Sequence, residues 1–156
     1  MNLFYSQNRL IHTIMFTTSH LHPMLVHFPI ALVIFGFLAE VAFLFFKNES
    51  SLRKMGYYLL IAGTLAAIVA WLTGNFFTSE MDGAAGKMRE SHELFATITL
   101  VLLLVTSLFR TALVILKNNN STFRILAFIL YSLAAISVSI TGYLGGSLVY
   151  NFMLGL

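Results

Sequence analysis

Four histidines of this chain could act together as ligands. His20, His22 and His27 lie in the stretch HLHPMLVHFPIAL, where the first long apolar run begins, and His92 stands at the start of the third run. Neutral imidazole is a common axial ligand of haem iron and also binds copper and zinc. Ionisable side chains at membrane segments are functional candidates by default. Whether these histidines can bind a metal or haem together depends on how the elements that carry them are arranged.

The composition is that of a membrane protein. Of the 156 residues, 58% are apolar and 10% are charged, and the mean hydropathy is +0.86, whereas a soluble domain carries about 25% charged residues. Four runs reach the length of about 20 residues that a transmembrane helix needs, at 24–46, 57–77, 93–116 and 123–144. They lack the alternation of barrel strands. We predict an all-α fold, a four-transmembrane-helix bundle over 22–156, preceded by an interfacial extension over 1–21.

The loop charges predict an orientation. Six of the nine basic residues lie at the ends of the runs joined by the first and third connections. The positive-inside rule makes that side cytoplasmic, so both termini are expected outside. The chain has no cysteine, which excludes disulfides, thiolate metal sites and covalently attached haem. It has no basic stripe with interleaved aromatic residues, so no nucleic-acid partner is expected.

Two segments suggest an internal repeat. AAIVAWLTG, ending at Gly74, and AAISVSITG, ending at Gly142, align without a gap. His27 precedes the first glycine, and His92 the second, by similar distances. The bundle would then consist of two repeated helical hairpins, each with a histidine at its outward start and a glycine at its outward end. A chance match between alanine-rich helices remains the alternative.

The repeat leads to a haem hypothesis. In an up-and-down bundle the first and third helices are diagonal, roughly 11–14 Å apart if neighbours are about 8–10 Å apart. Two histidines can then face each other across an iron atom, with small residues making room for the macrocycle. We expect a b-type haem held by His27 and His92 as the iron ligands. The other expected contacts of this cofactor are His22, Gly74, Gly142 and Tyr143.

Two other interpretations remain open from these residues alone. Histidine and aromatic residues are common interfacial anchors, and glycines are common where transmembrane helices touch. Alternatively, His20, His22, His27 and His92 could form a copper or zinc site. Nothing indicates a nucleophile or an oxyanion site, so the chain is more plausibly a carrier or a subunit than a stand-alone enzyme. The runner-up function is a cofactor-free structural or assembly subunit of a respiratory complex.

The chain also resembles an uncharacterised bacterial family of four-helix inner-membrane proteins. The resemblance rests on HPMLVHFPIAL, an acid late in the first run, and TGYLGGSLVY at the end of the fourth, and it covers roughly residues 21–150. Members stand beside c-type cytochrome domains or are fused to them. The resemblance therefore implies c-type cytochromes or subunits of a respiratory complex as partners. Membrane lipid and a second copy of the chain are the other expected partners. The family's histidines match His22, His27 and His92, and Glu40 stands where aspartate is expected.

Glu40 and Arg110 are charges placed inside predicted transmembrane runs. Each lies about 10 Å inside its helix, counted at 1.5 Å per residue from the lysine that follows the run. A lone charge at that depth is expensive. We therefore predict that the two side chains pair. The alternative is that Arg110 extends to the membrane surface while Glu40 is protonated.

Overall fold

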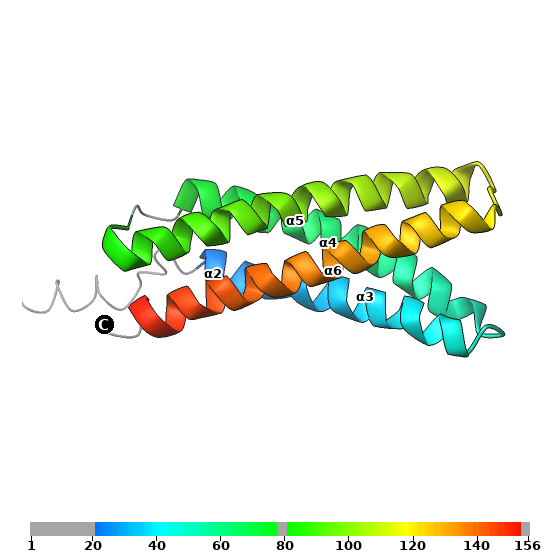
Figure 1. Cartoon of the computed structure of the whole chain (residues 1–156), viewed down its shortest axis with the longest axis horizontal. Helices are drawn as coiled ribbons and strands as arrows, with labels where there is room; N and C mark the ends of the chain where they lie inside the picture. The colour runs from blue at the N-terminus through cyan, green and yellow to red at the C-terminus, as the bar shows by residue number, and fades with distance from the viewer. Residues whose placement is uncertain (1–20, 78–80, 154–156) are drawn as a thin grey trace, which may run out of the picture.

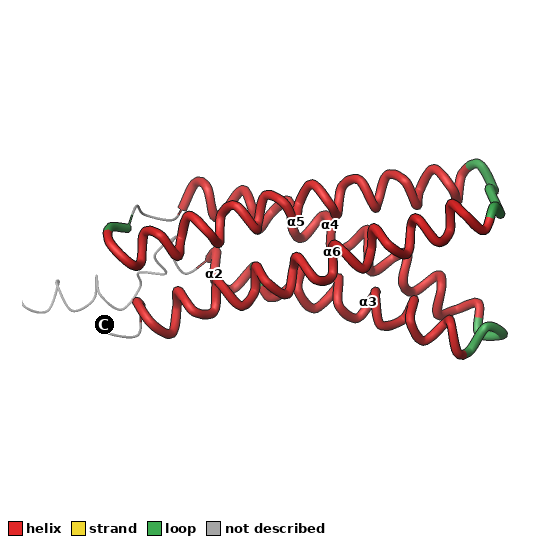
Figure 2. Tube along the Cα trace, viewed as in Figure 1, coloured by secondary structure: helices red, strands yellow, loops and turns green. Residues whose placement is uncertain are grey.

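The computed structural model describes residues 21–77 and 81–153. All regular elements in these ranges are helices, and the four long ones lie side by side in an up-and-down bundle (Figures 1 and 2). Their bounds are Leu21–Leu25 (α2) and His27–Phe45 (α3) for the first, Ser50–Phe77 (α4), Gly83–Ile115 (α5) and Ser121–Leu148 (α6), the last continued by a π-helical turn, Val149–Met153 (η2). Each is long and apolar enough to cross a membrane. The predicted all-α four-helix fold is confirmed.

All four helices begin before the predicted runs, and two of them by about two turns or more. α4 starts at Ser50 rather than at residue 57, and α5 starts at Gly83 rather than at residue 93. The added turns are polar, because a hydrophobic run marks only the part of a helix that lies in hydrocarbon. With 33 residues, α5 is about 50 Å long at 1.5 Å per residue, against about 30 Å for the hydrocarbon core.

The first helix is interrupted at Val26, between α2 and α3. Pro29 has no N–H to donate to the carbonyl of Leu25, so the helical hydrogen bonding is interrupted about one turn before the proline. The Val26 amide still donates to the carbonyl of His22 at 3.1 Å. The chain thus keeps its direction, and the residues of α2 stay packed against α4.

Packing within the bundle follows the two hairpins. α3 packs mainly along α4, and α5 along α6, while the contacts of α3 with α6 and of α4 with α5 close the ring. The helices α3 and α5 are therefore diagonal, as expected. The fully buried side chains at the centre include Val33, Leu60, Leu103 and Tyr131. Large apolar side chains point outward along every long helix, so the outer faces of this multi-pass membrane protein contact lipid.

Hydroxyl groups join the helices inside the apolar core. Thr64 of α4 and Ser107 of α5 lie 2.7 Å apart, and Thr99 of α5 lies 2.7 Å from Ser137 and 2.9 Å from Thr141 of α6 (hydroxyl oxygens). A polar group in hydrocarbon needs such a partner. These bonds hold α5 at a fixed height relative to its two neighbours.

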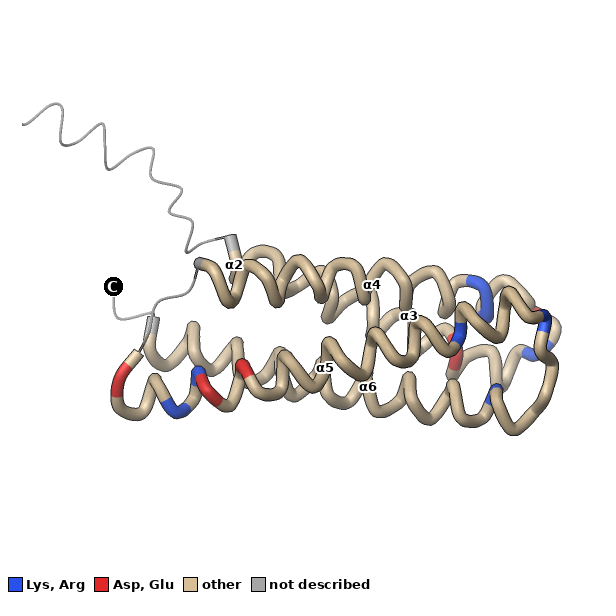
Figure 3. The backbone as a smooth tube through the Cα atoms, turned by 90° about the horizontal axis from the view of Figure 1, so that it is seen from above, with Lys and Arg blue, Asp and Glu red and all other residues tan. Residues whose placement is uncertain are grey.

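The two ends of the bundle differ in their side chains. One end, which we call the histidine end, carries α2, the start of α5 and the ends of α4 and α6 (Figure 1). The opposite end, the basic end, carries the two short loops and gathers most of the lysine and arginine residues (Figure 3). The basic residues of that end are Lys47, Arg53, Lys54, Arg110, Lys117 and Arg124.

Candidate functional site

A pair of half-buried histidines lies at the histidine end. His22 of α2 and His92 near the start of α5 stand edge to face, with ring centroids 6.3 Å apart and ring planes at 74°. They belong to different hairpins and to diagonal helices. We call these two residues the histidine pair.

Hydrogen bonds fix the proton on each ring. Nδ1 of His92 lies 3.1 Å from the carbonyl oxygen of Thr141, which can only accept, so this nitrogen carries the hydrogen. Nδ1 of His22 lies 3.1 Å from the hydroxyl of Thr73, which already donates its own hydrogen to the carbonyl of Ala70 at 2.9 Å. That ring must therefore also donate through Nδ1. In the neutral form both rings carry their lone pair on Nε2, the pattern typical of metal-ligating histidines.

Each ring also lies against a glycine of the helix that accepts its hydrogen bond. A Cβ atom at Gly74 would lie 2.9 Å from Cε1 of His22, and one at Gly145 would lie 3.0 Å from Cε1 of His92. Any side chain at these positions would displace the ring. Gly142, the predicted glycine, instead packs against Ile30, whose Cδ1 would be 3.0 Å from an added Cβ. The glycine contact in the second hairpin is thus made by Gly145, one turn further along α6.

The contacts of the histidine pair follow the predicted repeat. Thr73 and Thr141 are the aligned threonines of the two repeat segments. His22 is hydrogen-bonded to the side-chain hydroxyl of Thr73, and His92 to the backbone carbonyl of Thr141. The sequence separations are 51 residues for His22 and Thr73 and 49 for His92 and Thr141. The equivalent histidines of the two hairpins are therefore His22 and His92.

The expectation that His27 turns inward to face His92 was wrong. His27 is exposed, and its Nδ1 donates to the carbonyl of Pro23 at 2.8 Å. Five helical positions separate it from His22, a rotation of about 140°, so the two rings cannot share a face. Tyr143 is 74% exposed on α6 and points out of the bundle. His12 and His20 lie outside the described residues.

One member of the predicted copper or zinc set, His20, lies outside the described residues. Over residues 21–77 and 81–153, no three histidine, cysteine, aspartate or glutamate side chains gather where a metal ion could bind. Zinc and copper sites in proteins commonly use three or four such ligands. Two imidazoles alone suit a metal-containing cofactor whose own atoms supply the remaining ligands of the metal.

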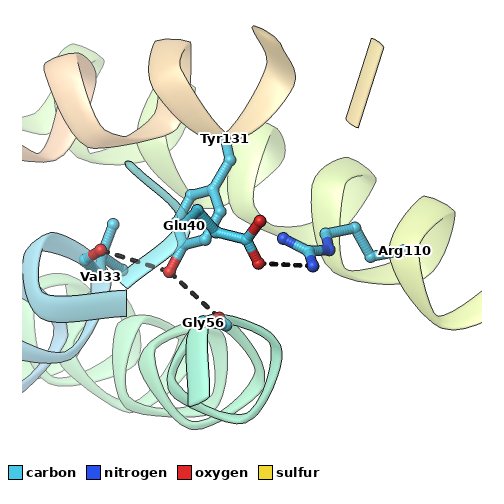
Figure 4. A network of polar contacts seen from close by, with 5 residues as sticks. All are labelled: Val33, Glu40, Gly56, Arg110 and Tyr131. Atoms are coloured by element: carbon cyan, nitrogen blue, oxygen red, sulfur yellow. Dashed lines mark hydrogen bonds and ion pairs between the residues drawn. The ribbon is translucent and has the colours of Figure 1, made fainter. Parts of the chain in front are cut away.

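A second polar cluster lies toward the basic end (Figure 4). One guanidinium nitrogen of Arg110 on α5 lies 2.6 Å from Oε1 of Glu40 on α3, and both side chains are about nine-tenths buried. No well-aligned hydrogen bond reaches that oxygen in the described part of the chain, so the contact is mainly electrostatic. The hydroxyl oxygen of Tyr131 lies 3.3 Å from the carbonyl oxygen of Val33 and 3.5 Å from that of Gly56, so the two carbonyls share its single hydrogen. The predicted pairing of Glu40 with Arg110 is confirmed.

The two polar clusters share one face on each helix. Glu40 follows His22 by 18 positions, and Arg110 follows His92 by 18 positions. Because 18 residues make about five turns, each histidine lies on the same side of its helix as the charged residue, about 27 Å away. This spacing could have identified His22 from the sequence, since a buried charge must face the interior.

The family comparison agrees with this architecture. A profile of the family described as "Predicted membrane protein (DUF2231)" matches residues 18–156. The chain belongs to this family. The matched region contains the four membrane helices and both polar clusters. No match was found among curated proteins or among solved structures. The family description names no reaction, so a function must be argued from the histidine pair.

Proposed function

We propose that this protein is a small electron-transfer protein of the bacterial inner membrane, holding a b-type haem between His22 and His92. The observation that carries the proposal is the fixed protonation of both rings. Each uses Nδ1 to donate to its own hairpin, which leaves Nε2 as the free ligand atom. A haem bound there would supply a one-electron couple.

The spacing of the two rings supports the same assignment. The ring centroids are 6.3 Å apart, and an imidazole nitrogen binds a metal at about 2.0 Å, so both rings would be within reach of one iron atom. Thr73 and Thr141 would hold the rings in orientation, and Gly74 and Gly145 would let them approach their helices. Because the sequence has no cysteine, the haem would be held without covalent attachment.

The orientation of the chain belongs to the same proposal. By the positive-inside rule the basic end faces the cytoplasm, which puts both termini and the histidine pair on the periplasmic side. There the haem could exchange electrons with a c-type cytochrome or another subunit of a respiratory complex. A second copy of the chain is the other partner expected within the membrane.

A cofactor-free structural role is the second candidate. The edge-to-face contact of His22 and His92 links the two hairpins directly, and the Nδ1 nitrogens are already hydrogen-bonded. A histidine pair of this kind could simply clamp the bundle of an assembly subunit. The two candidates differ in whether Nε2 binds iron.

The visible absorption spectrum separates the two candidates. We expect the full chain, purified in detergent and mixed with equimolar haem, to give the sharp bands of a low-spin bis-histidine haem. His22→Ala and His92→Ala should each lose these bands, because each removes one of two iron ligands. The measurement is the spectrum of the oxidised and reduced protein, with haem content per chain.

His27→Ala is the matched control, because it removes an exposed histidine five residues from His22. It should keep the full spectrum and haem content. Loss of haem in His27→Ala with retention in His22→Ala would reject the proposed ligand pair. A colourless wild-type protein in the presence of excess haem would favour the structural clamp.

The proposed orientation has its own test. A reporter fused after Asn119, in the loop between α5 and α6, should give a cytoplasmic signal, and one fused after Asp82 should give a periplasmic signal. The reason is the excess of lysine and arginine at the basic end. The opposite pair of signals would put the histidine pair on the cytoplasmic side.

A further inference from the structure

A cavity of about 620 Å³ lies at the basic end, between the ends of the four helices. Its floor is the pair of Glu40 and Arg110, and Phe43 and Phe128 are among its apolar walls. Three more cations line it from three different segments, namely Arg53 on α4, Lys117 in the loop between α5 and α6, and Arg124 on α6. The cavity therefore combines apolar walls with four positive side chains.

The positive charge of this cavity is largely uncompensated. Among the described residues that line it, Glu40 is the only carboxylate, and it is engaged by Arg110. Arg53 lies over the ring of Phe43, 5.7 Å from its centroid, and Arg124 donates to the side-chain oxygen of Asn119 at 2.7 Å. Neither contact is with an acid. A net charge of about +3 at a membrane boundary favours an anionic ligand.

Lys117 occupies a backbone position that usually holds glycine. Its φ is 48°, and it follows the end of α5 in a Schellman turn, in which the amide of Asn118 donates to the carbonyl of Leu113 at 3.0 Å and that of Lys117 to Val114 at 3.2 Å. Glycine adopts this conformation without the steric cost that lysine has. A lysine in this backbone conformation, where glycine would be less strained, suggests a role for its side chain. Here that side chain contributes a cation to the cavity.

We propose that this cavity binds the phosphate headgroup of an anionic phospholipid. The phosphate would lie among Arg53, Lys117 and Arg124, and an acyl chain would follow the apolar wall. The lipid is favoured over free phosphate because two apolar lining residues, Val114 and Ile125, are 56% and 60% exposed on the lipid-facing surface. The cavity thus opens sideways to the membrane, as basic pockets between transmembrane helices do when they hold lipid headgroups.

The test compares two double variants with equal loss of charge. Lys117→Gln with Arg124→Gln removes two cations of the cavity, whereas Lys47→Gln with Lys54→Gln removes two exposed cations of the same end that do not line it. Native mass spectrometry of the full chain would measure binding of phosphatidylglycerol, with phosphatidylcholine as the zwitterionic reference. Each basic group near an anionic lipid contributes about 1 kcal/mol, so the cavity variant should bind phosphatidylglycerol about tenfold or more weakly. The control should change less than about twofold.

Three results would overturn the proposal. The first is equal binding of phosphatidylglycerol and phosphatidylcholine by the wild-type chain. The second is an equal loss in both double variants, which would indicate general surface charge. The third is saturable binding of inorganic phosphate that excludes the lipid, which would identify a free anion as the ligand. Lys117→Gly is a further check, because it should relieve the backbone while still weakening lipid binding.

Discussion

Replacing Glu40 by methionine should lower the free energy of unfolding by about 3–5 kcal/mol, because it leaves the buried Arg110 without its counter-charge. Arg110→Met should have an effect of similar size, since the two groups are in contact at 2.6 Å inside the bundle. The double variant should recover most of the loss, because a pair of apolar side chains carries no desolvation penalty. Reversible unfolding in mixed micelles, followed by circular dichroism, would measure all three variants.

An exposed acid serves as the control for this cycle. Glu93→Met, on the outer face of α5, should change the free energy of unfolding by less than about 0.5 kcal/mol. If the double variant lost as much as the two single variants together, Glu40 and Arg110 would act independently and the pair would not be the stabilising unit.

Substituting Gly56 by alanine should destabilise the bundle by about 1–2 kcal/mol. A Cβ at this position would lie 2.6 Å from Oε1 and 2.8 Å from Cγ of Glu40, so it would push the carboxylate away from its partner. Overpacking of this kind costs about 1–3 kcal/mol, against a gain of up to about 1 kcal/mol when alanine replaces glycine in a helix. The same unfolding measurement would show the net loss.

Gly146→Ala is the matched control for this substitution. It also lies in a helix, but an added Cβ there meets no atom within 4 Å. Only the helix-propensity gain remains, so this variant should be as stable as the wild type or slightly more stable. Equal changes in Gly56→Ala and Gly146→Ala would show that close packing at Gly56 does not decide stability.

The sequence predicted the four membrane helices because a run of apolar residues is a local property. It also predicted the contact of Glu40 with Arg110, since two buried opposite charges at one depth have few other ways to be satisfied. The first turns of α4 and α5 were missed because helices continue into water, where hydrocarbon no longer limits the composition. The cavity of the basic end was not predicted either, since its lining comes from four separate helices.

The choice between His22 and His27 was made by tertiary packing. Both stand in the same short motif, and only the rotation of the first helix decides which one faces inward. That rotation is set by the buried face of α3, which carries Pro29, Val33, Gly36 and Glu40. If this face is continued from Pro29 by about two turns toward the N-terminus, it reaches position 22. Position 27 then lies about 140° away from position 22 around the helix axis. The sequence by itself determined the helices, the depth of their polar groups and, through the 18-residue spacing from Glu40, a signal for His22. Only the packing of the four helices determined that the rings of His22 and His92 meet, because ring contact depends on how the helices are rotated and placed relative to one another.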